Sequence, residues 1–178
     1  LASVVTGFGS ATLRVRVVDT QRPGEIFAPI HWSHETASSG RVGALVNAQY
    51  DPVSGQPELK ATPCKIAPVS YTRQGFVMVR RRVRLGQDGF WSWSAIEGGF
   101  ATRIETDAAA EALVSALGFD RDAELISYRD EGRGIGRFAY IVDGRLETVL
   151  FLGGAFGDAP WTGLALAWVA RRISDEQR

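Results

Sequence analysis

The sequence predicts a mainly β protein whose second half also contains helices. Three observations predict this class. Apolar and polar residues alternate over short runs near the start of the chain, and clusters of Gly, Pro and Asp separate these runs. Two later segments instead have the capping residues and apolar spacing of helices. Short strands with tight turns are typical of a small barrel or sandwich, and a mixture of strands and helices is typical of an α+β domain.

The first part of the chain is expected to contain short strands. Residues 1–6 and 11–18 form a predicted β-pair, because apolar and polar residues alternate in the second run and glycines separate the two. A third strand is expected at residues 25–30, after a turn with the sequence DTQRPG. A fourth is expected at residues 62–69, where two prolines restrict it to the edge of a sheet.

The character of the sequence changes between residues 67 and 72. We place a domain boundary there, between a first domain of residues 1–68 and a second of residues 69–178. The second domain begins with expected strands at residues 75–83 and 90–96, separated by the turn sequence GQDG.

A helix, three strands and a second helix are expected in the rest of the chain. Thr106 and Asp107 predict the start of a helix that ends at Leu117. Three strands follow, and the pair Asp143-Gly144 predicts a hairpin between the last two; the expected ranges are 124–128, 137–142 and 145–152. A final helix is expected from Asp158 and Pro160 to about residue 173.

Composition narrows the classes of function. Lys and Arg balance Asp and Glu at 20 each, which gives no support to nucleic acid, a membrane surface or a polyanion as the main partner. Cys64 is the only cysteine, which excludes a disulfide framework, a zinc cluster and a self-contained iron–sulfur site. A reducing, cytoplasmic location is the simpler expectation. The start has no signal peptide or membrane span and lacks Met, so we expect a fragment of a longer chain.

Residues 27–63 concentrate polar side chains in a long loop, and long ordered loops are usually functional. His31 and Trp32 either fill the core at a strand end or face a ligand. His31 and His34 lack a well-placed third ligand, so the sequence does not predict a metal site. Asp51, Ser54 and their neighbours predict consecutive turns.

The same turns could present a planar set of hydrogen-bonding groups to a ligand. The amides of Asn47 and Gln56 each combine two donors and an acceptor, which suits the edge of a purine or pterin ring. Lys60 adds a compact cation for a phosphate or a ring oxygen. The residues alone leave this interpretation and the purely structural one open.

Three runs carry a resemblance to a known family: FAPIHW at residues 27–32, RVGALVN at 41–47 and DPVSGQPELK at 51–60. They resemble the C-terminal molybdopterin-dinucleotide-binding domain of molybdopterin oxidoreductases, and are most similar to the bacterial assimilatory nitrate reductases. The resemblance covers residues 1–68. It implies a double-psi β-barrel of six strands that closes over a bis-molybdopterin guanine dinucleotide cofactor.

The resemblance also implies roles for individual residues. The lysine that ends the family motif corresponds to Lys60, and the family's pterin-contacting asparagine falls on Gly43, so either Asn47 or the backbone of Gly43 would make that contact. His31 and Trp32 occupy positions where the family approaches the cofactor. Asp51, Ser54 and Gln56 are assigned to shaping the loop first and to contacting the ligand second.

The activity implied by the resemblance is the reduction of nitrate to nitrite at molybdenum, with electrons from an iron–sulfur cluster in another part of the protein. Catalytic residues and metal ligands are not expected in these 178 residues. The expected partners are the remainder of the catalytic subunit and an electron donor: ferredoxin, flavodoxin or a nicotinamide-linked reductase. The alternatives are a non-catalytic interaction module and another molybdopterin oxidoreductase, such as a formate dehydrogenase.

Residues 69–178 resemble the small C-terminal domain of flavin-dependent nitrite and rubredoxin reductases, through the strand, Asp-Gly turn, strand and Trp-bearing helix of residues 138–173. This implies either a module that docks an electron donor or a structural extension. A basic run at residues 80–84 lies within an expected strand, where it is interpreted as a solvated face or a protected edge and not as a nucleic-acid site.

Overall fold

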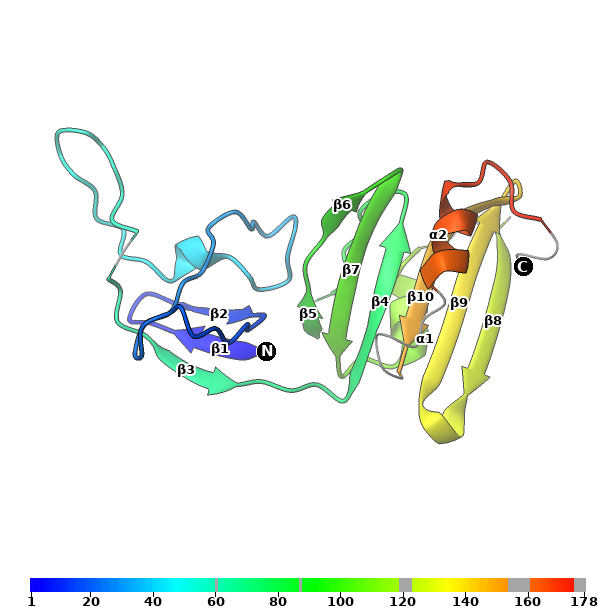
Figure 1. Cartoon of the computed structure of the whole chain (residues 1–178), viewed down its shortest axis with the longest axis horizontal. Coiled ribbons are helices and arrows are strands. Elements are labelled where there is room, and N and C mark those ends of the chain that lie inside the picture. Colours follow the sequence, from blue (N-terminus) through cyan, green and yellow to red (C-terminus); the bar gives the residue numbers. More distant parts are fainter. Residues whose placement is uncertain (60, 87, 119–122, 154–160, 175–178) are drawn as a thin grey trace. The chain divides into compact units, whose positions relative to one another are not determined.

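The computed structural model of the chain describes residues 1–59, 61–86, 88–118, 123–153 and 161–174. It forms two compact units, Leu1–Ser70 and Tyr71–Arg178 (Figure 1). Both are built on antiparallel sheets, which confirms the mainly β class. Neither of the two described helices is long and apolar enough to cross a bilayer.

The first unit contains a three-stranded antiparallel sheet in the order β2-β1-β3. Its strands are β1 (Ala2–Val5), β2 (Ser10–Leu13) and β3 (Lys65–Pro68). Alternation in β1 buries Ala2 and Val4 and exposes Val5. Val4 packs with Ala11 of β2 and with two residues in and beside the short 3-10 helix η1 (Val42–Ala44), namely Val42 and Leu45.

The pair of strands near the start is confirmed, but two expectations for this unit are wrong. Strand β2 ends at Leu13 and not at residue 18, and residues 25–30 are not a strand. An alternating sequence becomes a strand only where a neighbour accepts its hydrogen bonds and covers its apolar face. Val17 is 91% exposed and Phe27 80% exposed, so neither segment has such cover among the described residues.

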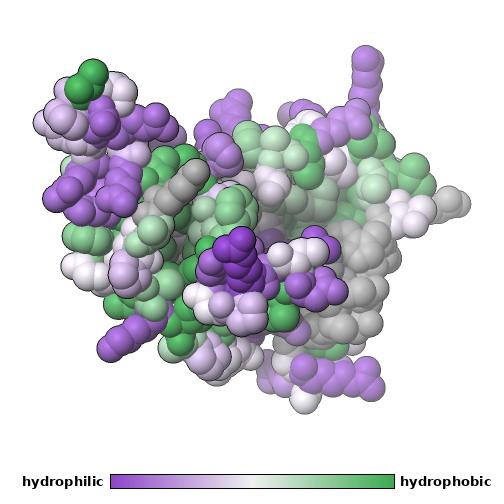
Figure 2. All heavy atoms as spheres, turned by 60° about the vertical axis from the view of Figure 1, so that its left-hand side comes forward, coloured by the Kyte–Doolittle hydropathy of each residue, from purple (hydrophilic) through white to green (hydrophobic). Residues whose placement is uncertain are grey.

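Apolar side chains on the surface are frequent in the first unit. Figure 2 shows apolar residues among the hydrophilic ones on the face that it presents. The exposed large apolar residues of this unit are Val5, Phe8, Val15, Val17, Val18, Ile26, Phe27, Ile30, Tyr50, Val53, Leu59 and Ile66.

The second unit is a seven-stranded antiparallel sheet in the order β5-β7-β4-β10-β9-β8, with β6 also paired to β7. The strands are β4 (Arg73–Val79), β5 (Gly89–Trp91), β6 (Ser94–Ile96), β7 (Gly99–Thr106), β8 (Glu124–Asp130), β9 (Ile135–Val142) and β10 (Arg145–Leu152). A 3-10 turn, η2 (Glu131–Arg133), joins β8 to β9.

One helix covers each face of this sheet (Figure 1). Helix α1 (Ala110–Ala116) contributes Leu113 to a core that includes Val77 and Leu150. Helix α2 (Trp161–Val169) contributes Trp168 to a second core that includes Met78 and Val149. Consecutive residues of β4 and β10 therefore enter opposite cores, as the period of two requires.

The predicted hairpin between β9 and β10 is confirmed. Asp143 and Gly144 both have positive φ, 52° and 77°, as a two-residue type I′ turn requires. Glycine adopts this conformation at little cost, and aspartate tolerates it better than most residues.

Three expectations for the second unit are wrong. Residues 90–96 form two short strands, and β7, at residues 99–106, was not expected. Helix α1 follows Ala109, so Thr106 and Asp107 do not cap it: the Thr106 hydroxyl donates to Asp88 and an Asp107 carboxylate oxygen accepts from the backbone N–H of Thr72. The final helix ends at Val169, and its expected start at Asp158 and Pro160 lies outside the described residues.

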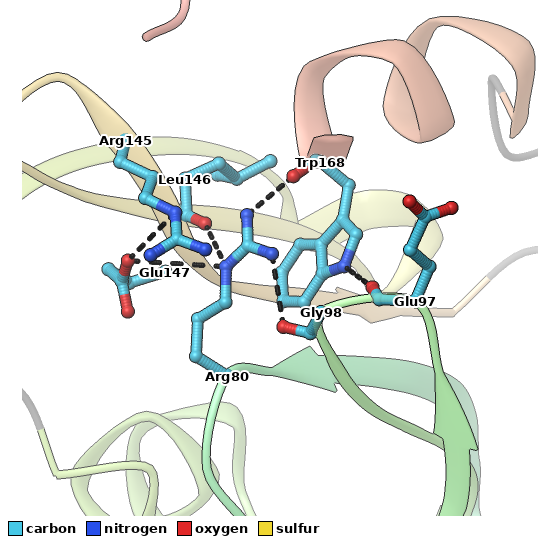
Figure 3. A network of polar contacts seen from close by, with 7 residues as sticks. All are labelled: Arg80, Glu97, Gly98, Arg145, Leu146, Glu147 and Trp168. Atoms are coloured by element: carbon cyan, nitrogen blue, oxygen red, sulfur yellow. Dashed lines mark hydrogen bonds and ion pairs between the residues drawn. The ribbon is translucent and has the colours of Figure 1, made fainter. Parts of the chain in front are cut away.

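The basic run is also placed differently from the expectation. Strand β4 ends at Val79, so Arg80 to Arg84 follow the strand and do not form a face of it. The side chain of Arg80 is only 10% exposed, and its guanidinium lies 3.8 Å from the ring centroid of Trp168. It donates to the carbonyl oxygens of Leu146, Gly98 and Trp168 (Figure 3).

Arg80 therefore joins α2 to the sheet. Burial is the main cause that lowers the pKa of Arg80, assisted by the nearby charge of Arg145, while Glu147 opposes the shift. The Trp168 ring N–H donates to the carbonyl oxygen of Glu97 at 2.9 Å, so the same tryptophan is fixed at both its backbone and its ring. The largely buried guanidinium remains stable because three carbonyl groups and an aromatic ring replace its interactions with water.

We expect Arg80→Ala to lower the free energy of unfolding of the second unit by about 3 kcal/mol, because it leaves three carbonyl groups without their charged donor and removes the stacking on Trp168. Urea unfolding of this chain, followed by tryptophan fluorescence, measures the change. Arg81→Ala is the matched control, since Arg81 is exposed and should alter stability by less than about 0.5 kcal/mol. Equal effects of the two substitutions would contradict the assigned role of Arg80.

Candidate cofactor-binding site

The sequence DPVSGQP forms a small hairpin. Tyr50 and Pro57 are bridge partners across it, and the backbone N–H of Asp51 donates to the carbonyl of Gln56 at 2.9 Å. The N–H of Gly55 donates back to the carbonyl of Asp51 at 2.8 Å. In Figure 1 this hairpin projects from the three-stranded sheet of the first unit. It therefore presents its side chains on both flanks of a tight turn.

The carboxylate of Asp51 fixes the turn. Its Oδ1 accepts hydrogen bonds from the N–H of Ser54 at 2.7 Å, the hydroxyl of Ser54 at 3.0 Å and the N–H of Val53 at 2.9 Å. These bonds, those from Ser54 first, hold the pKa of Asp51 below its ordinary value of 3.8. Gly55 closes the turn at φ 70°. Asp51, Ser54 and Gly55 thus each have a local structural reason.

The flanks of the hairpin enclose a shallow hollow of about 450 Å³. Its lining residues are Gln49, Tyr50, Asp51, Ser54, Gln56, Pro57 and Glu58. This volume is within the range of small-molecule sites, about 300–1,000 Å³. Two side-chain amides, a phenol and two carboxylates offer donors and acceptors in one place, which suits a polar planar ring better than an apolar ligand. The carboxylates of Asp51 and Glu58 are negatively charged and would repel a phosphate group.

Asp51, Ser54 and Gln56 are the residues expected from the sequence that the hollow brings together. Gln49, Tyr50 and Glu58 were not expected. The sequence could have indicated them, because residues on the two sides of the turn from Asp51 to Gly55 face one another across the hairpin. Lys60 lies outside the described residues.

Asn47 and Gly43 do not line the hollow. Asn47 is half-buried, and Gly43 is exposed within η1. A Cβ atom built on Gly43 would meet nothing within 4 Å, so packing does not require glycine there. The space needed for the family's asparagine is therefore present at residue 43, although the side chain is absent.

His31 and Trp32 lie apart from the hollow as well. His31 is exposed and Trp32 is half-buried, and no strand ends at them. They precede a turn in which the N–H groups of Thr36 and Ala37 both donate to the carbonyl of Ser33 at 3.0 Å. Within the described residues, no three His, Cys, Asp or Glu side chains are placed to hold a metal ion.

Comparison with known proteins finds a family that is similar to most of the first unit. The sequence profile of the family described as "Molydopterin dinucleotide binding domain" matches residues 1–63, which include the whole hairpin. Residues 1–63 are therefore similar to this family. The match covers the hollow and strands β1 and β2, and it ends before β3 and before the second unit begins at Tyr71.

Two curated relatives are nitrate reductases. The nitrate reductase of Klebsiella oxytoca is 39% identical over 98 residues, which are 55% of this chain and 11% of the relative. That of Synechocystis sp. (strain ATCC 27184 / PCC 6803 / Kazusa) is 43% identical over 61 residues, 34% of this chain and 8% of the relative. The chain thus spans about a tenth of the length of either relative. No solved structure matches this chain.

The similarity to the Klebsiella protein is longer than the first unit. It covers 98 residues, whereas the first unit has 70, so part of the second unit is also similar to that nitrate reductase.

We expect the Asp51 turn to open at acid pH. A group whose pKa is lower in the folded state stabilises the fold above its unfolded pKa, and this contribution is lost as pH falls through the folded pKa. The amide NMR shifts of Val53 and Ser54 should therefore titrate below about pH 4, since both N–H groups donate to Asp51. Asp51→Asn retains a side-chain oxygen but cannot titrate, so its two shifts should stay constant. Titration of the same two amides in that variant would contradict the assignment.

Proposed function

We propose that this chain is the C-terminal portion of the catalytic subunit of a molybdenum-dependent nitrate reductase. The first unit would hold a bis-molybdopterin guanine dinucleotide cofactor, and the whole enzyme would reduce nitrate to nitrite. The match of residues 1–63 to the dinucleotide-binding family carries the proposal. The two relatives, both nitrate reductases, supply the substrate class.

The hollow between the hairpin flanks fits the base of such a dinucleotide. Guanine presents adjacent N–H groups on one edge, and the carboxylate of Glu58 can accept hydrogen bonds from them. The amides of Gln49 and Gln56 can form hydrogen bonds with the neighbouring ring atoms. The carboxylates of Asp51 and Glu58 would repel a pyrophosphate. We therefore assign the hollow to the base of the dinucleotide and not to its phosphates.

Asp51 has a positioning role in this proposal. Its carboxylate already accepts three hydrogen bonds from Ser54 and Val53, so it holds the hairpin in shape while Gln56 and Glu58 face the base. Lys60 is proposed from the sequence to supply a cation to a phosphate or ring oxygen. His31, Trp32, Gly43 and Asn47 are proposed to contact other parts of the cofactor from outside the hollow.

The bound cofactor supplies the two-electron chemistry of nitrate reduction, and this chain supplies binding and orientation. An iron–sulfur cluster held by residues beyond these 178 would deliver the electrons, because one cysteine cannot hold a cluster. The similarity to the Klebsiella nitrate reductase supports a place for at least part of the second unit in the same subunit.

In the full-length enzyme, we expect Gln56→Ala to lower the molybdenum content after gel filtration by about fivefold, because one hydrogen-bonding group to the base is lost. Metal analysis together with nitrate reduction driven by dithionite-reduced methyl viologen measures the effect. Lys60→Ala should lower cofactor retention in the same direction. Gln21→Ala is the control, since Gln21 lies in the same unit and does not line the hollow.

Two results would count against the proposed function. Full-length protein that contains no molybdenum and reduces no nitrate would reject the assignment to a nitrate reductase. Normal molybdenum content in Gln56→Ala would reject the assignment of the hollow while leaving the reaction in place.

A further inference from the structure

Several elements of the second unit end side by side at one end of its sheet. Val79, the last residue of β4, pairs with Thr148 near the start of β10 and with Phe100 near the start of β7. The β9–β10 turn lies at the same end, and the N–H of Ile173, beyond α2, donates to the Gly144 carbonyl of that turn. Residues that follow β4 and α2 are thereby brought to one place.

Arginine predominates at this end of the sheet. The basic residues on the elements that meet here are Arg80, Arg81, Arg82, Arg84, Arg145, Arg171 and Arg172. The described acidic residues on the same elements are Glu97, Glu124, Asp143 and Glu147; Asp175 and Glu176 follow in the sequence and lie outside the described residues. Among the described residues, positive charge therefore exceeds negative charge at this end, although the net charge of the chain is zero.

Two of these arginines already have partners. Arg80 is buried against Trp168, and Arg145 lies 3.7 Å from the Glu147 carboxylate, which is itself 4.0 Å from Arg80 (Figure 3). The other arginines at this end are exposed and form no ion pair within the described parts of the chain. Arg82 is oriented by Phe100, whose ring centroid lies 5.2 Å from its guanidinium.

Apolar side chains lie beside these exposed arginines. Helix α2 has the sequence WTGLALAWV, without a charged residue, and Leu166 and Val169 on its outer side are 59% and 56% exposed. Val169 directly follows Trp168, whose carbonyl accepts from Arg80, so this apolar surface adjoins the start of the basic loop. A helix that is apolar on all sides is normally covered on all sides.

We propose that this end of the second unit, with Arg81, Arg82, Arg171 and Arg172 beside Leu166 and Val169, docks an acidic electron-carrier protein. The inference rests on the proposed function, because a nitrate reductase must receive electrons from a donor. Arginines beside exposed aliphatic residues are typical of protein interfaces, whereas nucleic acid is held mainly through phosphates. The apolar outer side of α2 therefore favours a protein partner.

The test compares two electron donors for the full-length enzyme. Reduced methyl viologen is a small molecule that needs no docking surface, whereas a reduced acidic [2Fe–2S] ferredoxin does. In the double variants Arg81→Gln/Arg82→Gln and Arg171→Gln/Arg172→Gln, we expect the KM for ferredoxin to rise about tenfold, with kcat from viologen unchanged. Added salt should raise the wild-type KM for ferredoxin and affect the variants less.

Arg129→Gln/Arg133→Gln is the matched control. It removes the same charge from two exposed, ion-paired arginines near the other end of the sheet, where Arg129 pairs in register with Gly136. We expect its KM for ferredoxin to equal that of the wild type. The two test variants lie on separate elements, so a local disturbance of one loop cannot explain a shared effect.

Three results would overturn the inference. These are an unchanged KM for ferredoxin in both test variants, an equal rise in the control variant, and binding of a single-stranded DNA oligonucleotide that the test variants abolish. If the wild-type enzyme reduces no nitrate with viologen, the proposed function fails first and the inference loses its basis. Viologen activity with an unaltered response to ferredoxin rejects the docking surface alone.

Discussion

The central strands β4 and β10 have to bury both of their faces, and this constraint organises the second unit. Consecutive residues such as Val77 and Met78 enter different cores, so a helix is needed on each side of the sheet. Helix α2 is short and has few polar groups of its own to fix its position. The buried guanidinium of Arg80 supplies that fixation by joining the sheet to Trp168. A charged side chain thereby joins the helix to the sheet beside a mainly apolar core.

The first unit is organised differently. Its three-stranded sheet buries a small core around Val4, and many large apolar residues remain exposed. Its best-defined feature is one hairpin, whose shape is determined by the carboxylate of Asp51. That shape determines which side chains line the hollow. A hairpin of this kind needs little core of its own, because hydrogen bonds between near neighbours specify it.

Features set by near neighbours could be predicted from the sequence. The β9–β10 hairpin follows from Asp143-Gly144, and the turn at Asp51 follows from its Asx and Gly residues. Strand β7 was missed because its inward positions include Thr102 and Thr106, whose buried hydroxyls are satisfied by the backbone oxygens of Arg103 and Asp88. Polar residues at buried positions conceal the alternation by which a strand is recognised.

Features set by distant contacts could not be predicted. Arg80 resembles its exposed neighbours in sequence, and contacts with distant residues such as Trp168, 88 residues later, explain why its side chain is only 10% exposed. For the same reason Gln49 and Glu58 were not assigned to the site until the hairpin brought them together. The family resemblance supplied what the residues alone left open, namely the similarity of the polar loop to part of a dinucleotide-binding domain.

Hydrogen–deuterium exchange of the full-length enzyme, with and without its molybdenum cofactor, tests the central claim most directly. The claim is that the Asp51 hairpin contacts the dinucleotide. It predicts slower exchange in the peptide of residues 49–58 when the cofactor is bound, because the ligand covers the hollow that these residues line. Unchanged exchange in that peptide, with protection confined to other parts of the enzyme, would contradict it.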